Sequence, residues 1–239
     1  MRLLVTRPQE DAERTAAALR ARGHAVLVAP LLRIEPIAAD LGPGPFAAVL
    51  TTSANAARAV AQHPRLGELR GLPLYTVGQR SGEGARAAGF SAVHSADGDV
   101  RDLVSLVARE QSATAPLLYL AGEERSADLS EELGRRGFSV RTLVVYRAHA
   151  AERFPPAAEQ AIAAGELDGV LHYSRRSAAA FIDCADAADL AERALRLTHY
   201  CLSAQVAAPL ADSGAATIRL AQRPDEEALL ALIGSPSLP

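Results

Sequence analysis

Apolar and polar positions alternate along this chain with two different periods. Short apolar runs, such as those within 47–53 and 168–174, have the length and composition of buried β-strands. Between them, apolar residues recur at helical spacing. Strands that alternate with helices of about 10–14 residues predict parallel sheets covered by helices on both faces, so the fold class expected is α/β. The helices are expected near 8–22, 54–62, 80–88, 99–110, 126–137, 156–164, 175–195, 204–213 and 225–233.

The same pattern occurs twice. Three pairs of segments match in order, with a constant offset inside the first and longest pair. These pairs are 2–36 with 116–150, 47–53 with 168–174, and 75–78 with 200–203. Each copy has enough strands and helices for one open, doubly wound sheet, so the chain is predicted to be a duplicated two-lobed protein.

Two apolar segments, 28–37 and 140–149, do not look like ordinary loops and could be extended ribbons that cross between lobes. In that case one lobe would hold roughly 38–140 and the other roughly 1–30 with 150–239. Otherwise the lobes would be the first and second halves of the chain. The hydrophobic pattern leaves both partitions open.

The amino-acid composition excludes several classes of function. Charged residues are 22% of the chain, the formal net charge is −3, and no basic run occurs, so nucleic acid is not an expected partner. The chain contains no lysine. This absence excludes Schiff-base enzymes, those that use pyridoxal phosphate among them, and the lysine of a phosphate-binding P-loop.

The sequence carries no sign of a membrane segment. No apolar stretch approaches the ~20 residues that cross a bilayer, and Arg7 interrupts the apolar start of the chain. We therefore expect a cytoplasmic protein. Cys184 and Cys201 lie too far apart for a C-x-x-C motif, and two buried thiols are expected.

Candidate chemistry lies where strands end, because ligands of open α/β sheets bind beyond the carboxyl ends of the strands. The segments after the strands are rich in Ser, Thr, Gly and Asn: 6–8, 52–55, 77–81, 121–123, 174–177 and 203–205. Such residues cap helices in any protein, but they also leave backbone N–H groups that attract anions. Their number, from both copies, favours a ligand with several carboxylates.

Other motifs are absent. The sequence has no G-x-G-x-x-G after its first strand, no Walker sequence, no H-E-x-x-H and no nucleophile elbow. The histidines are scattered, so no metal site is expected, and His172 is interpreted as a structural residue. Tyr146 ends the apolar run of the second ribbon, and polar Arg147 follows it. Its hydroxyl could donate a proton or hydrogen bond, or its ring could simply pack between the lobes.

Several of these segments together resemble the uroporphyrinogen-III synthase family. The matching pieces are Thr6-Arg7-Pro8, 52–56, Val77-Gly78 with Ser81, 122–129, Val145-Tyr146-Arg147 and the Ser174 turn. The resemblance implies two Rossmann-like, flavodoxin-like lobes joined by a two-stranded β ladder. It favours the interleaved partition, with 1–33 plus 148–239 as one lobe, 37–144 as the other, and linkers near 30–37 and 140–149.

The resemblance also implies a reaction. Hydroxymethylbilane, a linear tetrapyrrole with many carboxylates, would lose its terminal hydroxyl as water and close with its last ring inverted, giving uroporphyrinogen III. No cofactor or metal would be used, the preceding deaminase could hand over the substrate, and the protein would be a monomer. Tyr146 would assist the departure of the hydroxyl. Residues implied in substrate binding are Arg7, Ser53, Asn55, Gly78, Ser81, Gly122, Ser174, Ser203 and Gln205.

Two positions depart from the family pattern. Ser81 stands where the family usually has Thr, and 202–206 lacks the usual Gly and Thr, although Ser203 and Gln205 could donate in their place. Two other classes of function stay open. One is a cytosolic anion-binding or sensor protein with two lobes. The other is a scaffold that uses the apolar ribbons 28–37 and 140–149 for docking.

Overall fold

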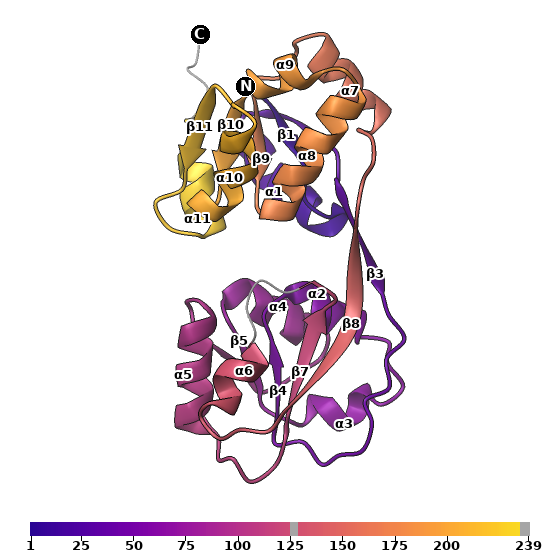
Figure 1. Cartoon of the computed structure of the whole chain (residues 1–239), viewed down its shortest axis with the longest axis vertical. Coiled ribbons are helices and arrows are strands. Elements are labelled where there is room, and N and C mark those ends of the chain that lie inside the picture. The colour runs from indigo at the N-terminus through magenta and orange to yellow at the C-terminus, as the bar shows by residue number, and fades with distance from the viewer. Residues whose placement is uncertain (125–128, 235–239) are drawn as a thin grey trace. The chain divides into compact units, whose positions relative to one another are not determined.

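The computed structural model describes residues 1–124 and 129–234, and the chain forms two compact units (Figure 1). Unit 1 consists of Met1–Arg33 with His149–Pro239, and unit 2 consists of Ile34–Ala148. The chain therefore passes between the units twice, once after Arg33 and once after Ala148. Each unit is an α/β sandwich with its own sheet and its own cores.

The sheet of unit 1 is parallel, with the strand order β11-β10-β9-β1-β2. Its strands are β1 (Arg2–Val5), β2 (Ala25–Val28), β9 (Gly169–His172), β10 (Thr198–Cys201) and β11 (Thr217–Leu220). In β1 the consecutive residues Leu3, Leu4 and Val5 are all fully buried. A central strand of a parallel sheet is covered on both faces, which explains why this strand is an unbroken apolar run.

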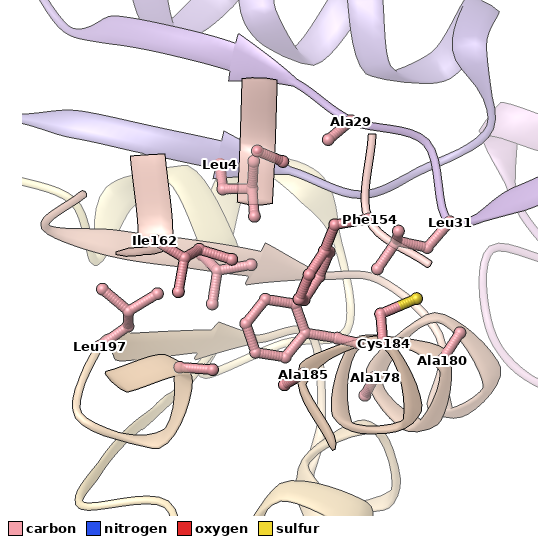
Figure 2. Close-up of a cluster of buried hydrophobic side chains, with 14 of the residues drawn as sticks. Leu4, Ala29, Leu31, Phe154, Ile162, Ala178, Ala180, Cys184, Ala185 and Leu197 are labelled. Carbon is pink, nitrogen blue, oxygen red and sulfur yellow. The ribbon is translucent and has the colours of Figure 1, made fainter. Parts of the chain in front are cut away.

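Helices cover both faces of this sheet. They are α1 (Gln9–Ala21), α7 (Pro156–Ala163), α8 (Arg175–Ala187), α9 (Ala191–Leu195), α10 (Ala204–Asp212) and α11 (Glu226–Ala231). Residues of α7, α8, α9 and α10 form one core with the sheet, and α1 and α11 form the other. In the close-up of Figure 2, Phe154 and Cys184 lie in the first core with Leu4 and Leu31.

Unit 2 repeats this plan. Its strand order is β3-β8-β7-β4-β5-β6. The strands are β3 (Leu32–Pro36), β4 (Ala48–Thr51), β5 (Leu74–Thr76), β6 (Val93–Ser95), β7 (Leu117–Gly122) and β8 (Val140–Ala150). The helices are α2 (Ala54–Ala59), α3 (Leu66–Arg70), α4 (Gln79–Ala87), α5 (Val100–Glu110) and α6 (Leu129–Gly134). One face is covered by α2, α3 and α4, and the other by α5 and α6.

The two sheets confirm the predicted α/β fold with parallel sheets. The order β6-β5-β4-β7-β8 in unit 2 corresponds strand for strand to β11-β10-β9-β1-β2 in unit 1. This correspondence is the one that the repeated segments predict. The additional strand β3 lies beside β8, so the two apolar ribbons of the sequence pair with each other.

Three expectations about local structure need correction. The helix expected over 175–195 is two helices, α8 and α9, because the chain turns at Asp189, which has a φ of 56°. The short helix α3 was not expected; its buried Leu66 and Leu69 hold it against the sheet. Tyr146 lies inside β8, which continues to Ala150, and not at the end of a ribbon.

The helix expected over 126–137 is seen as α6 from Leu129, and 126–128 lie outside the described residues. Among the helices of the described chain, none combines the length and apolar character that crossing a membrane would require.

Candidate functional site

Neighbouring strands of unit 2 carry candidate residues at one edge of the sheet. The strands β8, β7, β4 and β5 lie side by side and run parallel, so their carboxyl ends share an edge. Gly122 ends β7, and Tyr146 is its partner on β8. The edge brings together Tyr146, Gly122, the turn with Ser53 and Asn55, and the turn with Gly78 and Ser81.

Two buried threonines shape the turns at this edge. The Thr51 hydroxyl donates to the Ser53 carbonyl at 3.0 Å, and its oxygen accepts from the Ser53 N–H at 3.2 Å. One strand along, the Thr76 hydroxyl donates to the Gly78 carbonyl at 3.1 Å. Both threonines are fully buried. Neither threonine was predicted to belong to the site, although each ends an apolar strand directly before a candidate turn.

The turns open helices that differ in their caps. Ser53 caps α2, and its hydroxyl accepts from the Asn55 N–H at 3.2 Å. Gly78 stands at the N-cap of α4 and has no side chain, so no side-chain cap bonds the first turn of that helix in the described chain. First-turn N–H groups without a cap are free to bind a ligand anion.

Close packing joins the start of α2 to the middle of α4. A β-carbon built on Gly84 of α4 would lie 2.7 Å from the β-carbon of Ala54, the first residue of α2. Only glycine allows this approach. Asn55 carries a carboxamide that accepts from Arg58 at 3.1 Å, and Ser81 is 7% exposed in the first turn of α4. Both side chains lie in the first turns of helices that follow the neighbouring strands β4 and β5.

Tyr146 lies against the end of β7. A β-carbon built on Gly122 would lie 2.7 Å from Tyr146 Cζ and 2.8 Å from the phenol oxygen. Next to them, Arg147 donates from Nε and Nη2 to the two carboxylate oxygens of Glu123, at 2.9 and 2.8 Å. The hydrogen bonds that Arg147 donates to Glu123 raise the pKa of Arg147. The strand that carries the phenol is thus linked to the end of β7 by the Arg147–Glu123 pair.

Unit 1 presents an equivalent edge, formed by β10, β9 and β1. Ser174 caps α8, where its hydroxyl accepts from the Ser177 N–H at 3.1 Å and donates to the Ser177 hydroxyl at 3.0 Å. Ser203 caps α10 and accepts from the Val206 N–H at 3.4 Å. Gln205 is exposed in the first turn of α10. The hydroxyls of Ser174 and Ser203 therefore serve the helices that they open.

Arg7, the remaining candidate, lies in a buried polar cluster of unit 1. Its guanidinium donates to Glu226 at 2.8 Å and to the Thr15 hydroxyl at 3.0 Å, and stacks 3.7 Å from the centre of the Tyr173 ring. Asp11 lies 3.8 Å away. The Arg7 side chain is only 6% exposed. A direct contact with substrate would require this guanidinium to leave its partners.

The electrostatics of the cluster follow from its burial. Burial lowers the pKa of Arg7 and raises that of Tyr173. Burial also disfavours the Glu226 carboxylate, but the hydrogen bond from Thr15 and the charges of Arg7 and Arg14 outweigh it, so the pKa of Glu226 is lowered. Hydrogen bonds and ion pairs between opposite charges in this cluster connect the start of α1, the end of β9 and α11.

His172, which was expected to be a structural residue, and the two cysteines lie in the interior of unit 1. His172 is fully buried beside His199, with His172 Nε2 3.1 Å from His199 Nδ1. Cys184 and Cys201 are buried free thiols. Within residues 1–124 and 129–234, no group of three or more His, Cys, Asp or Glu side chains is arranged to hold a metal ion.

Comparisons with known proteins agree on one family. The family model described as uroporphyrinogen-III synthase HemD matches residues 13–231. A crystal structure of uroporphyrinogen-III synthetase from Helicobacter pylori is 20% identical, with a TM-score of 0.67, covering 97% of this chain and 98% of that chain. A mutant uroporphyrinogen III synthase from Thermus thermophilus is 16% identical, with a TM-score of 0.55 and 97% of each chain covered.

A search of curated proteins found no match. The two crystal structures support the fold, and the family model supports the family, since it spans nearly the whole chain. The chain belongs to the uroporphyrinogen-III synthase family.

Proposed function

We propose that this chain is a lyase that cyclises hydroxymethylbilane to uroporphyrinogen III, with loss of water and inversion of the last ring. The observation that carries the proposal is the family match over residues 13–231. In this reaction the terminal hydroxyl takes up a proton and leaves as water while a pyrrole nitrogen supplies the electron pair. The azafulvene that forms is attacked by the far pyrrole ring, and the spiro intermediate fragments and recloses.

The substrate sets a problem of position. The bilane closes by itself without inverting the last ring, so the enzyme must hold a flexible polyanion in a shape in which a different carbon attacks. Fixing reacting groups in a productive geometry removes entropy from the barrier and needs no strong acid or base. A protein for this task needs many anion-binding groups held on rigid elements.

We propose that each unit binds part of the substrate through its own edge. In unit 2 the uncapped first turn of α4, which begins after Gly78, would bind a carboxylate with Ser81, and Ser53 and Asn55 would bind a second. In unit 1 the corresponding groups are Ser174, Ser203 and Gln205. Arg7 would support the unit 1 edge through Tyr173 and Glu226.

Tyr146 is the proposed catalytic residue. Its phenol would donate a hydrogen bond or proton to the departing hydroxyl of the bilane, which lowers the energy of the leaving group in the transition state. The support is its place at the unit 2 edge beside the proposed carboxylate-binding turns. The proposed reaction uses no cofactor.

Three accompanying proposals concern the setting. We propose that the protein acts as a monomer in the cytoplasm and receives its substrate from the deaminase that makes it. Sedimentation velocity tests the monomer, and cell fractionation tests the location. The transfer is tested by mixing the deaminase and this protein with an excess of a reagent that captures free bilane and measuring how much bilane it captures.

The proposed function is tested by the isomer of the product. Freshly generated hydroxymethylbilane is incubated with the protein, with buffer and with heat-denatured protein, and the oxidised products are separated by chromatography. The proposal expects type III uroporphyrin with native protein and type I with both controls. Type I product from native, folded protein would refute the proposal.

A further inference from the structure

The backbone around Tyr146 is held from both neighbouring strands. On the β7 side, the Glu123 N–H donates to the Tyr146 carbonyl at 3.0 Å. On the β3 side, the Ile37 N–H donates to the Val145 carbonyl at 2.8 Å. Tyr146 is therefore carried by an internal strand, and the direction of its side chain depends on the local register.

That register is irregular at this point. The β7–β8 ladder pairs Ala121 with Val144 and then Gly122 with Tyr146, which leaves Val145 as an extra residue in β8. In a regular strand, neighbouring side chains point to opposite faces, but a β-bulge breaks this alternation. Val145 and Tyr146 both pack against the same core, the one formed with α2, α3 and α4. The bulge thus turns Tyr146 to the face that carries the candidate helix starts.

Gly122 lies under the redirected ring. Leu118 and Leu120, which alternate with it along β7, face the same core, so a side chain at position 122 would point toward that core too. A β-carbon there would lie 2.7 Å from Cζ, 2.8 Å from the phenol oxygen and 3.1 Å from Cε2 of Tyr146. The first two distances are shorter than side-chain β-carbons show in proteins, and the third is tight. The Tyr146 ring occupies the space that any other residue at 122 would fill.

The Glu123–Arg147 pair follows directly after these two residues. Its two parallel hydrogen bonds link the residue after Gly122 to the residue after Tyr146. A planar guanidinium that binds both oxygens of a carboxylate fixes the distance and the orientation between the two groups. The pair therefore restrains the position of β8 relative to the end of β7 beyond the bulge. The backbone of Tyr146 is thus restrained by its neighbours, and its ring lies over Gly122, which has no side chain.

We propose that Gly122 is a positioning residue for the reaction, which acts through Tyr146: its missing side chain, with the bulge at Val145, creates the place where the phenol is held. This inference rests on the proposed function and assigns Gly122 a role other than substrate contact. A residue that binds substrate changes KM when altered, whereas one that positions a catalytic group changes kcat. The two roles therefore differ in a measurable way.

The first test is structural and needs no substrate. Proteins with ¹³C-labelled tyrosine are compared by NMR, and the Tyr146 ring signals are assigned with Tyr146→Phe. Gly122→Ala should shift the Tyr146 signals and leave those of the other tyrosines in place. Gly67→Ala is the matched control, since its added β-carbon meets nothing within 4 Å and lies in a helix of the same unit. Unshifted Tyr146 signals in Gly122→Ala would overturn the inference.

The second test is kinetic. Gly122→Ala should lower kcat for type III product about 10- to 100-fold, with KM changed less than about threefold. In a Tyr146→Phe background, the same change should lower kcat less than about twofold, because the residue through which it acts is already disabled. Equal losses in the two backgrounds, or a rise in KM alone, would overturn the inference.

A folding control keeps the test decisive. If Gly122→Ala does not fold, Gly122→Ala with Tyr146→Ala should fold, because the overlapping ring is gone. A double variant that also fails to fold would overturn the inference. Absence of type III product with wild-type protein would instead refute the proposed function, and the NMR comparison would still report on the position of the ring.

Discussion

Two histidines in the core of unit 1 should make its stability depend on pH. His172 on β9 and His199 on β10 are fully buried and lie in hydrogen-bond contact. Both rings meet the edge or face of Phe181, at centroid distances of 5.3 and 5.7 Å. Burial and the neighbouring His199 lower the pKa of His172 well below its usual value of 6.5. Burial lowers the pKa of His199 to about 4.

The magnitude follows from proton linkage. In the unfolded chain both rings titrate near their usual value, so between about pH 6.5 and 4 the unfolded state binds more protons than the folded state. Stability is therefore complete above about pH 6.5 and is lost as the pH falls toward about 4. For His199 alone the loss in the free energy of unfolding is about 3 kcal/mol, and His172 acts in the same direction. Such a loss is a large part of the ~5–15 kcal/mol that stabilises a domain.

The cysteines provide an assay specific for unit 1. The chain has two cysteines, Cys184 and Cys201, and both are buried in this unit. Pulse labelling with a thiol reagent that reacts in acid, such as dithiodipyridine, along a urea gradient therefore measures the unfolding of unit 1 alone. We expect the urea midpoint to be clearly lower at about pH 4.5 than at about pH 7. Carboxylates such as Glu226, whose pKa is lowered, titrate below this window.

The control is a variant without the two imidazoles. Leu74 occupies the position in unit 2 that corresponds to His199, so the repeated fold already carries leucine at that position. In His172→Leu/His199→Leu the urea midpoint should vary little over the same pH window. Equal pH dependence in the wild type and the double variant would refute the attribution to the buried histidines.

The remaining predictions concern single residues. Tyr146→Phe should lower kcat about 100-fold or more with the urea midpoint of the protein unchanged, and an unchanged kcat would remove its catalytic role. Arg7→Ala should destabilise unit 1 by about 1–3 kcal/mol in the thiol-labelling assay, because Glu226 loses its buried cation but keeps Arg14, Thr15 and Tyr173 as partners; no measurable loss would contradict a structural role. Thr51→Val, which keeps the shape but removes the hydrogen bond to Ser53, should cost about 1 kcal/mol and raise KM, measured by urea unfolding and steady-state kinetics.

The sequence predicted the fold well because the fold is duplicated. Each half carries the same succession of strands and helices, and parallel strands joined by helices allow few arrangements, so the repeat implied two matching sheets. The break at Asp189 was not predictable in this way, because a left-handed residue other than glycine leaves little signal in the hydrophobic pattern. The sequence therefore predicted a single helix over 175–195.

Side-chain partners were harder to predict than elements. The closest carboxylate to Arg7 comes from Glu226, which is 219 positions away, and no local pattern reveals such a contact. The direction of the Tyr146 ring depends on one extra residue in β8, and a bulge moves a side chain to the other face without changing the composition of the strand. The sequence could select Tyr146 and Gly122, but not the contact between them.

If this chain directs the closure of hydroxymethylbilane, the isomer of the product depends on the protein. The most direct measurement is the fraction of type III isomer in the uroporphyrin formed from a fixed amount of fresh bilane at increasing protein concentration. We expect the type III fraction to rise from the background toward complete conversion, with each protein molecule turning over many bilane molecules. A type III fraction that stays at the background, with protein shown to be folded by thiol protection and urea unfolding, would refute this function.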